Sequence, residues 1–599
     1  MPIHKLSRFF PVFLIAAAVF FAVMSMVNDS QIVDEIPHVG AGYSYLVKQD
    51  MRLNPEHPPL AKDLAAIPLL FMGLKQTAFE NAHWLNTINS QWEFGRLLIY
   101  NSGNNGDDIK FFSRLPMLLF YILSAIIIFK WGGQLYGETG GIIALMIFLF
   151  SPTVMAHSRF VTTDVPALFG VLLSIYTFTN YLKQPTRRHL LIAGLAFGVA
   201  LLLKFSTFLL GPFLIAIGIF HGLIFDRHKY GHWKYGLRTI WGSLAIFAIG
   251  FFGVVWLVYG FHVWNYPPEQ QFYDTKALLS SFGNRTVADA VIWMADKPFI
   301  RALGQYLFGF LMVVQRSSGG NTIYFLGEIV NKGGPIYFPF VYFIKEPLAW
   351  WILAFIALAG ATYRVASVRR GWKRTFQWAH DHFAEVVMVG WLVFYWIISI
   401  RSTLNIGVRH LLPTYPFVIM LVAGQIARTA EWLRHHEKPF IKAFSVTIAL
   451  LLGWYMYENI RIFPYYLTYF NQTVGGPSGG YRYVTDSNLD WGQDLKRLSL
   501  YVKENNIEAI SLDYFGWADP YFYMGNQAIG VSAGSYRDAR DFLRRNQTDG
   551  WIAISATFFQ QATSPSADNP NKKLDYLWLK AYEPVTVIGN SIFVWHITE

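Results

Sequence analysis

Long apolar segments alternate with short polar ones along the first three quarters of the chain. A helix needs about 20 mostly apolar residues to cross the hydrocarbon of a bilayer, because each residue adds about 1.5 Å. We count about eleven such segments and predict a membrane helix in each, namely residues 9–27, 111–131, 139–154, 165–182, 190–203, 205–225, 240–261, 338–361, 383–400, 411–426 and 444–460. The pattern predicts an α-helical polytopic membrane protein.

Basic residues gather in every second loop between these segments, for example at Lys183, Arg187 and Arg188. Such clusters are typical of the cytoplasmic side of a membrane protein. The residues before the first segment are also basic, as in a signal peptide, but no small-x-small cleavage pattern follows, so we predict a retained membrane helix. The polar loop after the first helix, the other intervening loops and the C-terminal part then lie on the extracytoplasmic side.

The composition changes at about Phe463, where Asp, Asn and Gly become frequent and apolar spans cease. Helices are predicted at 491–503 and 538–545, strands at 507–514 and 550–556, and a hairpin at 585–596 that turns at Gly589-Asn590. We therefore predict two parts, a membrane module at 1–462 and an extracytoplasmic α/β domain at 463–599.

The composition agrees with this division and excludes several classes of function. The chain is 53% hydrophobic and only 15% charged, as expected of a membrane protein. Its net charge of +11 is spread over the loops, which favours membrane topology over nucleic-acid binding. The absence of cysteine excludes disulfides, Cys-ligated zinc and thiol catalysis. No P-loop, dinucleotide-binding or Asp-x-Asp motif is present, which argues against a soluble nucleotide-sugar donor.

The loop after the first apolar segment concentrates titratable residues. Asp34 and Glu35 come just before Pro37, which suits the first turn of a helix, and Glu56 and His57 lie in a proline-rich run. A helix N-terminus favours an ionised carboxylate that can accept a proton. The alternative is an ordinary polar loop with an amphipathic interfacial helix at about 60–67.

Asp34-Glu35 after the first membrane helix, followed by His57-Pro58-Pro59-Leu60, resembles the first external loop of the protein O-mannosyltransferases and their bacterial, aminoarabinose-transferase-like relatives. These are GT-C fold glycosyltransferases that depend on polyprenyl-phosphate sugars. The resemblance is firmest over the first 230 residues, and residues 486–495 resemble an element of a bacterial subgroup. It implies an inverting transfer of a hexose or pentose to an acceptor hydroxyl on the extracytoplasmic side of, for instance, a bacterial inner membrane. The tail departs from the β-trefoil of the eukaryotic enzymes, so glycan, lipid and protein acceptors all stay open.

By the same resemblance Asp34 matches the catalytic carboxylate, and Asp164 matches the Asp of the second external loop. Such a reaction needs a base for the acceptor hydroxyl and cations for the departing phosphate. We assign catalytic roles to Asp34, Glu35 and Asp164, donor-phosphate binding to Lys204, Arg409, Lys345 and His410, and support to Glu56, His57 and Arg159.

Each of these assignments has a structural alternative. Asp164 would pair with Arg159, Lys204 would extend to the membrane interface, and Lys345 would be neutralised by Glu346. No certain cofactor is indicated. Glu56 and His57 with a loop carboxylate have ligand types that a divalent cation accepts, although their spacing matches no known signature.

Two other classes of function fit parts of the pattern. A transporter or flippase of lipid-linked sugars would also have many spans and intramembrane cations, but transporters usually show internal repeats and ionisable residues at the midplane, whereas here they gather at one face. A membrane-anchored glycan-binding protein would use the C-terminal domain. The partners expected for the leading reading are a polyprenyl-phosphate sugar, an acceptor and the bilayer, and no nucleic acid.

Overall fold

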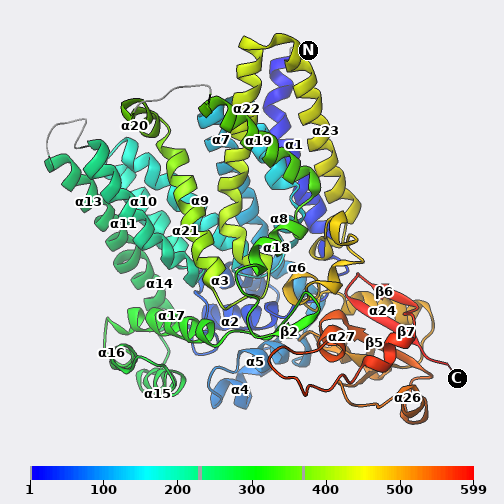
Figure 1. The fold of residues 1–599 in the computed structure, drawn as a ribbon. Helices are drawn as coiled ribbons and strands as arrows, with labels where there is room; N and C mark the ends of the chain where they lie inside the picture. The colour runs from blue at the N-terminus through cyan, green and yellow to red at the C-terminus, as the bar shows by residue number, and fades with distance from the viewer. Residues whose placement is uncertain (1–2, 227–232, 367–371, 599) are drawn as a thin grey trace.

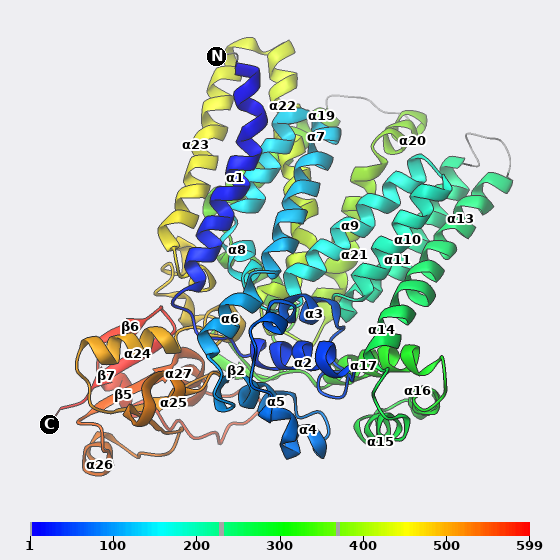
Figure 2. The same ribbon diagram turned by 180° about the vertical axis from the view of Figure 1, so that it is seen from behind.

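The computed structural model describes residues 3–226, 233–366 and 372–598. A bundle of long helices forms most of the molecule, and the C-terminal domain lies at one end of it (Figure 1). The N-terminus lies at the opposite end, and both side views agree on this arrangement (Figure 2). The described helices of the bundle are α1 (Ile3–Met26), α7 (Met117–Leu149), α9 (Asp164–Lys183), α10 (Arg187–Leu201), α11 (Leu210–His221), α13 (Trp233–Ala248), α14 (Trp256–His262), α18 (Tyr337–Lys345), α19 (Leu348–Ala366), α21 (Phe383–Arg401), α22 (Tyr415–His436) and α23 (Lys438–Ile462).

Within the described ranges, eight helices are long and apolar enough to cross a membrane, or nine if the bent pair α18 and α19 forms one span. The chain is therefore an integral membrane protein. The surface of the outer helices is consistent with this, since large apolar side chains such as those of Phe13 and Phe355 are mostly exposed. Such residues suit contact with lipid rather than water.

Helix α7 is in fact two antiparallel halves. Gly137 has a φ of 75°, outside the helical range, and the Tyr121 hydroxyl donates to the Leu149 carbonyl at 2.5 Å. In a straight helix these two residues would lie about 40 Å apart. Near the turn the two halves approach closely, since a Cβ on Gly141 would meet the Phe129 carbonyl oxygen at 2.8 Å and the Gly133 backbone nitrogen at 3.0 Å. The two halves correspond to the segments predicted at 111–131 and 139–154.

The prediction of one continuous helix at 338–361 is wrong. In the structure this segment forms two helices, α18 and α19, with a bend of 108° between them. Pro347 has no N–H to donate and pushes the residue before it out of the helical region. Glu346 accordingly has extended backbone angles, φ −107° and ψ 143°. The helix predicted from 411 likewise begins with a 3-10 segment, Val408–Thr414, before α22 starts at Tyr415, and Pro413 lies inside that segment.

The long stretch after α14, in which no membrane helix is predicted, is largely structured. It contains α15 (Pro268–Leu278), α16 (Arg285–Met294), α17 (Arg301–Gly319) and the antiparallel strands β1 (Ile323–Phe325) and β2 (Glu328–Val330). The Leu326 amide donates to the Tyr483 carbonyl at 2.9 Å, and the Ile329 amide to the Pro565 carbonyl at 2.8 Å. This hairpin therefore joins the loop to the C-terminal domain.

The other helices outside the bundle are short. They are α2 (Glu35–Lys48), α3 (Leu60–Ala66), α4 (Ala82–Leu85), α5 (Gln91–Arg96), α6 (Gly106–Arg114), α8 (Pro152–Ser158) and α20 (Trp372–Asp381). Helices α2 and α3 fall where the proline pattern of the first loop predicted them. With α8 they lie at the end of the bundle that carries the C-terminal domain (Figures 1 and 2).

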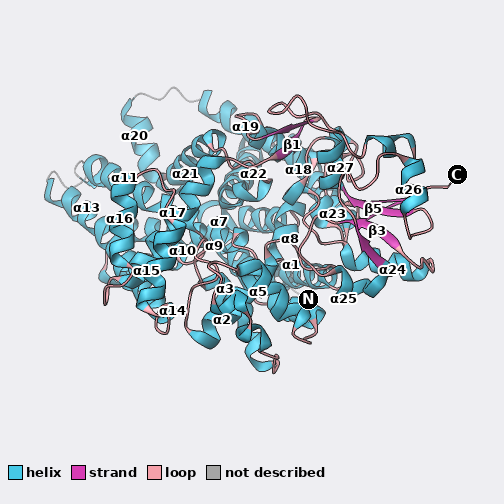
Figure 3. Ribbon diagram, turned by 90° about the horizontal axis from the view of Figure 1, so that it is seen from below, coloured by secondary structure: helices cyan, strands magenta, loops and turns pink. Residues whose placement is uncertain are grey.

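The C-terminal domain contains a five-stranded sheet in the order β4-β3-β5-β7-β6. Its strands are β3 (Ile510–Asp513), β4 (Ala528–Gly530), β5 (Trp551–Ser555), β6 (Thr586–Ile588) and β7 (Ile592–His596), and its helices are α24 (Leu495–Glu504), α25 (Pro520–Met524), α26 (Ala539–Arg545) and α27 (Ala556–Thr563). β3 is parallel to β4 and β5, whereas β7 is antiparallel to β5 and β6. Figure 3 shows these strands to one side of the helical bundle.

The predicted fold class, a polytopic helical membrane part with a C-terminal α/β domain, is confirmed. The predicted hairpin is present, and both turn residues have positive φ, 60° at Gly589 and 63° at Asn590, as a type I′ turn requires. Helix α23 ends at Ile462, and the sheet begins at Ile510. The boundary at 463 stays a prediction.

Candidate functional site

Two carboxylates and two cations meet at the end of the bundle that carries the C-terminal domain. One terminal nitrogen of Arg409 lies 2.8 Å from Asp34 Oδ2 and 3.4 Å from Asp164 Oδ2. Lys204 Nζ lies 2.5 Å from the other oxygen of Asp164. We call Asp34, Asp164, Lys204 and Arg409 the central cluster. These residues come from four distant parts of the sequence, and Arg409 is the bridge between the two carboxylates.

All four side chains of the central cluster come from helix ends or from short non-α-helical segments between helices. Asp34 is the N-cap of α2, and Asp164 is the first residue of α9, so both carboxylates lie at helix N-termini, where the helix dipole favours a negative charge. Lys204 lies in an extended break between α10 and a short 3-10 helix, Phe205–Leu209. Arg409 lies in the 3-10 segment before α22.

Burial differs within the central cluster. The Asp164 and Arg409 side chains are 1% and 9% exposed, whereas those of Lys204 and Asp34 are 15% and 25% exposed. Water or a substrate can therefore reach Asp34 and Lys204, while Asp164 lies behind them. In this surrounding of low dielectric the charges interact more strongly than they would in water.

Two imidazoles lie beside the central cluster. His38 Nδ1 is 2.9 Å from the Val161 carbonyl oxygen, and the His38 and His57 rings meet edge to face with centroids 4.9 Å apart. Burial lowers the pKa of both rings below the ordinary value, so both are neutral near pH 7. His57 thus lies where the sequence predicted a support for the Asp34 loop.

The proline-rich run that carries His57 is held by a buried lysine. Lys62 Nζ donates to the carbonyl oxygens of His57 and Asn54 at 2.8 and 3.0 Å. Glu56 points outward and pairs with Arg316 of α17 at 3.3 Å. Glu56 and His57 therefore bond to different parts of the chain.

Glu35 and Arg159 belong to a separate, buried ion-pair network. Arg114 holds Glu35 through two hydrogen bonds, 2.8 and 2.6 Å long. Arg159 pairs with Asp29, not with Asp164 as the structural alternative had it. Arg497 of α24 also reaches Asp29, at 2.6 Å. The network joins the first loop to the C-terminal domain, and of the Asp-Glu pair only Asp34 belongs to the central cluster.

The remaining predicted phosphate-binding residues divide in the same way. Lys345 is buried, and its Nζ donates to the carbonyl oxygens of Leu467 and Asn488 at 2.7 Å each, rather than to a carboxylate of the central cluster. His410 follows Arg409 directly, and its Nε2 is buried without a hydrogen-bond partner among the described residues. Of the two, His410 is the one beside the central cluster.

The structure adds residues that the sequence analysis did not select. The Trp491 ring lies under the Arg409 guanidinium, 4.1 Å from its central carbon. His157 packs against the same ring, and burial lowers the pKa of His157 to about 3. Burial raises the pKa of Asp486 to about 6 despite the opposing charge of Arg409. The resemblance at 486–495 was the only sequence signal for Trp491 and Asp486, and His157 had none.

Metal ligands are not grouped in the part of the chain that the structure describes. No set of three or more His, Cys, Asp or Glu side chains there could hold a metal ion. The divalent cation stays an untested prediction.

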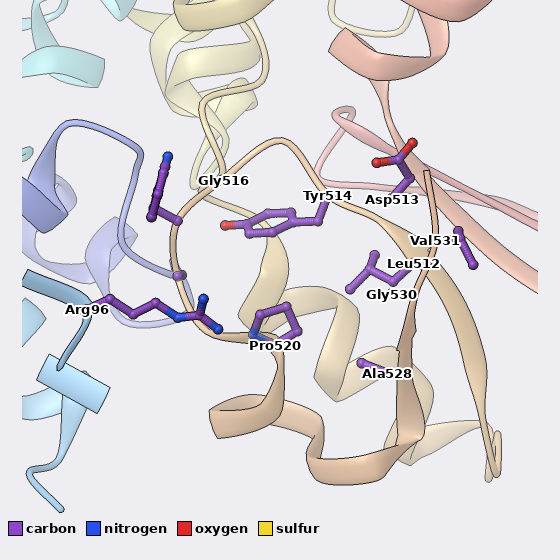
Figure 4. Close-up of a pocket in the computed structure, with 11 residues that line it drawn as sticks. Arg96, Leu512, Asp513, Tyr514, Gly516, Pro520, Ala528, Gly530 and Val531 are labelled. Carbon is purple, nitrogen blue, oxygen red and sulfur yellow. The ribbon is translucent and has the colours of Figure 1, made fainter. Parts of the chain in front are cut away.

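A cavity of about 370 Å³ lies between α5 and the C-terminal domain (Figure 4). It opens at the carboxyl ends of β3 and β4, and none of its lining residues belongs to the central cluster. They are Arg96, Leu512, Asp513, Tyr514, Gly516, Trp517, Ala518, Pro520, Ala528, Gly530 and Val531. The cavity is thus separate from the carboxylates and cations described above.

The fold and the central cluster define a polytopic membrane protein whose acidic and basic groups meet at one end of the helical bundle. Residues 106–256 match the family described as dolichyl-phosphate-mannose-protein mannosyltransferase. This match includes Asp164 and Lys204, and it confirms the predicted resemblance to glycosyltransferases that use polyprenyl-phosphate sugars. A comparison with curated proteins gave no match.

Solved structures of three glycosyltransferases are similar to this chain. The archaeal oligosaccharyltransferase AglB from Archaeoglobus fulgidus is 12% identical with a TM-score of 0.47, over 96% of this chain and 73% of that one. ArnT from Cupriavidus metallidurans is 11% identical with a TM-score of 0.29, over 97% of both chains. The S. cerevisiae protein O-mannosyltransferase Pmt1-Pmt2 complex is 20% identical with a TM-score of 0.28, over 43% of this chain and 34% of that one.

Proposed function

We propose that the protein transfers a sugar from a polyprenyl-phosphate donor to an acceptor hydroxyl, with Asp34 as the base. The observation that carries this proposal is the bridge that Arg409 makes between Asp34 and Asp164, with Lys204 on the far oxygen of Asp164. One site thus holds a water-accessible carboxylate beside two cations. The family match over residues 106–256 supports a lipid-linked sugar phosphate as donor.

The reaction is a displacement at the anomeric carbon of the sugar. The acceptor oxygen forms a bond to that carbon, its proton passes to an Asp34 oxygen, and the bond from the carbon to the phosphate oxygen breaks. The leaving phosphate takes the electron pair. Asp34 is the carboxylate for this role because it is the more exposed of the two, at 25% against 1% for Asp164. General-base catalysis contributes roughly a hundredfold to ten-thousandfold.

Lys204 and Arg409 would receive the charge that develops on the phosphate. A lysine ammonium has three donors and a guanidinium has five. Each therefore keeps donors for a phosphate after it has bonded to a carboxylate. Arg409 Nε is buried without a hydrogen-bond partner in the described part of the chain. Asp164 would hold both cations in place, and His410, next to Arg409, would line the same side of the site.

The other predicted site residues take structural roles in this proposal. Glu35 and Arg159 hold the first loop through Asp29 and Arg114, and Lys345 holds the segment around Asn488. His57 supports the loop beside His38. The site and the C-terminal domain face the extracytoplasmic side, since the basic N-terminus lies at the other end of the bundle.

The test is transfer of radiolabel from a polyprenyl-phosphate sugar by the purified protein, with cell-envelope glycan, lipid and protein fractions as acceptors. Label that moves into one fraction supports the proposal and identifies the acceptor class. Label that only crosses the bilayer of a proteoliposome, unchanged, would point to a flippase. Binding of glycan without transfer of label from any donor would point to a glycan-binding protein.

A further inference from the structure

Trp491 is a buried aromatic residue that the C-terminal part of the chain places against the central cluster. Its side chain is 1% exposed, and it lies between a short 3-10 helix, Asp486–Asn488, and α24. Besides the guanidinium of Arg409, the ring contacts the rings of His157 and Phe160, with centroids 5.9 and 6.1 Å away. These contacts fix the plane of the indole.

The Trp491 backbone and the nearby Asn488 side chain hold the residues that precede Asp34 and Arg409. The Val33 amide, one residue before Asp34, donates to the Trp491 carbonyl at 2.9 Å. The Val408 amide, one residue before Arg409, donates to the Asn488 side chain at 2.9 Å. The segment 488–491 therefore links the Asp34 loop to the Arg409 loop, although the two are more than 370 residues apart in the sequence.

We propose that Trp491 is a positioning residue for the transfer reaction and that it acts through Arg409. Residues 488–491 then make the C-terminal part of the chain a component of the active site. This inference rests on the proposed function of the same site. A cation over an indole face is held by the ring quadrupole, most strongly when both are desolvated. The ring covers one face of the guanidinium, and the guanidinium edge then faces Asp34 and Asp164.

The ring matters because the Arg409 side chain has few other restraints. A terminal nitrogen bonds to the two carboxylates, while Nε has no partner among the described residues. Without the indole, the plane of the guanidinium would be held only through the contacts of one terminal nitrogen, and its open face would take up water. Donor phosphate would then meet a cation that is present but misaligned.

The experiment compares Trp491→Ala and Trp491→Phe with a matched control, Trp517→Ala. Trp517 packs against Trp92, with ring centroids 5.1 Å apart and the rings tilted by 32°, and so also joins the first loop to the C-terminal domain, but it does not touch the central cluster. All variants are assayed for sugar transfer over a range of donor concentrations. Thermal unfolding of the same preparations reports whether each variant is folded.

We expect Trp491→Ala to reduce kcat/KM by about tenfold or more, the size of a desolvated cation–π contact, and Trp491→Phe to restore part of the loss because it keeps a ring. Trp517→Ala should transfer at the normal rate. If folded Trp491→Ala and Trp517→Ala transfer equally well, the inference is wrong. If Trp491→Ala does not fold, the same comparison is made with Trp491→Phe and Trp491→Leu, and equal activity of these two would also overturn it.

A double variant separates positioning from general support. If Trp491 acts through Arg409, Trp491→Ala should cost little further activity in an Arg409→Ala background, because the two losses are not additive for residues that act together. Fully additive losses would show that Trp491 does not act through Arg409. Wild-type protein that transfers no label from any donor would instead contradict the proposed function, and so the two failures are distinguishable.

Discussion

Asp34 and Glu35 are neighbours in the sequence but have different environments. Asp34 faces Arg409 and is a quarter exposed, whereas Glu35 is 1% exposed and bonded to Arg114. Successive residues at a helix start point about 100° apart, so the divergence follows from helix geometry. The sequence could identify the acidic pair, but the difference between the two environments depends on Arg114, which comes from another part of the chain.

We expect Glu35→Gln to lower stability more than activity. The amide leaves the buried Arg114 without its full counter-charge, and loss of one partner of a buried ion pair typically costs about 3–5 kcal/mol. Thermal unfolding should show the loss, while the folded fraction should still transfer sugar. Loss of transfer at unchanged stability would instead place Glu35 in the reaction.

Removal of either cation should weaken use of the donor. Lys204→Ala and Arg409→Ala each delete a charge that we propose binds the donor phosphate, and a contact of this kind typically contributes about 2–4 kcal/mol to the transition state. Donor titrations measure the effect, and Arg428→Ala is the control because Arg428 pairs with Glu385, away from the central cluster. Normal donor use by both Lys204→Ala and Arg409→Ala would exclude them from the site.

At the scale of elements, apolar runs predicted the helices well because membrane helices have a clear length and composition. The apolar runs did not predict the break in a helix that a proline causes, as at Pro347. They also missed the helices of a more polar stretch, α15 to α17. The central cluster is formed by breaks and helix ends. Their convergence depends on packing between distant segments, such as Val33 with Trp491, and a sequence pattern does not contain that information.

Asp490 gives a pH test of the junction between residues 486–494 and α27. Its carboxylate accepts a hydrogen bond from the Thr557 amide at 3.0 Å, and burial raises its pKa to about 7. An Asp carboxyl in an unfolded chain has a pKa near 4. Between pH 4 and pH 7 the folded state therefore binds this proton more tightly than the unfolded state does. This carboxyl therefore stabilises the fold less and less as the pH rises through that window.

We expect the Tm of Asp490→Asn, relative to wild type, to rise by about 2 °C or more between pH 5 and 7 and to level off above pH 7. The amide keeps the shape and the hydrogen-bond acceptor but does not titrate. Unfolding in detergent over this pH range measures the difference. A constant difference would mean that Asp490 is ionised in the folded protein throughout.

For the whole molecule, the combination of a helical membrane part and a C-terminal α/β part followed from the apolar segments and from the change in composition after them. What composition could not predict is how closely the parts join. Arg497 reaches Asp29 in the first loop, and β2 binds the backbone at Pro565. The C-terminal domain thus packs against the first loop, which carries Asp34, and against the hairpin of β1 and β2. Figures 1 and 2 show it at that end of the bundle.

This arrangement predicts that the C-terminal domain and the Asp34 loop share one side of the membrane, opposite the N-terminus. Single cysteines are informative because the chain has none of its own. The variants Asn89→Cys in the first loop and Tyr521→Cys in the C-terminal domain should react with a membrane-impermeant thiol reagent in intact cells. The variant Arg188→Cys should react only after lysis. If the cysteines of Asn89→Cys and Tyr521→Cys are labelled from opposite sides of the membrane, the structure is contradicted. If the cysteine of Arg188→Cys is labelled from the same side as the other two, the proposed orientation is contradicted.

The most direct test of the central claim is the transfer activity of Asp34→Asn, measured with its donor binding on the same preparation. The amide keeps the size of the side chain but does not take a proton, so transfer should fall by about a hundredfold to ten-thousandfold. Polyprenyl phosphate should still raise the Tm, because Lys204 and Arg409 remain. Near-normal transfer by Asp34→Asn, with transfer abolished in Asp164→Asn, would contradict the assignment of Asp34 as the base.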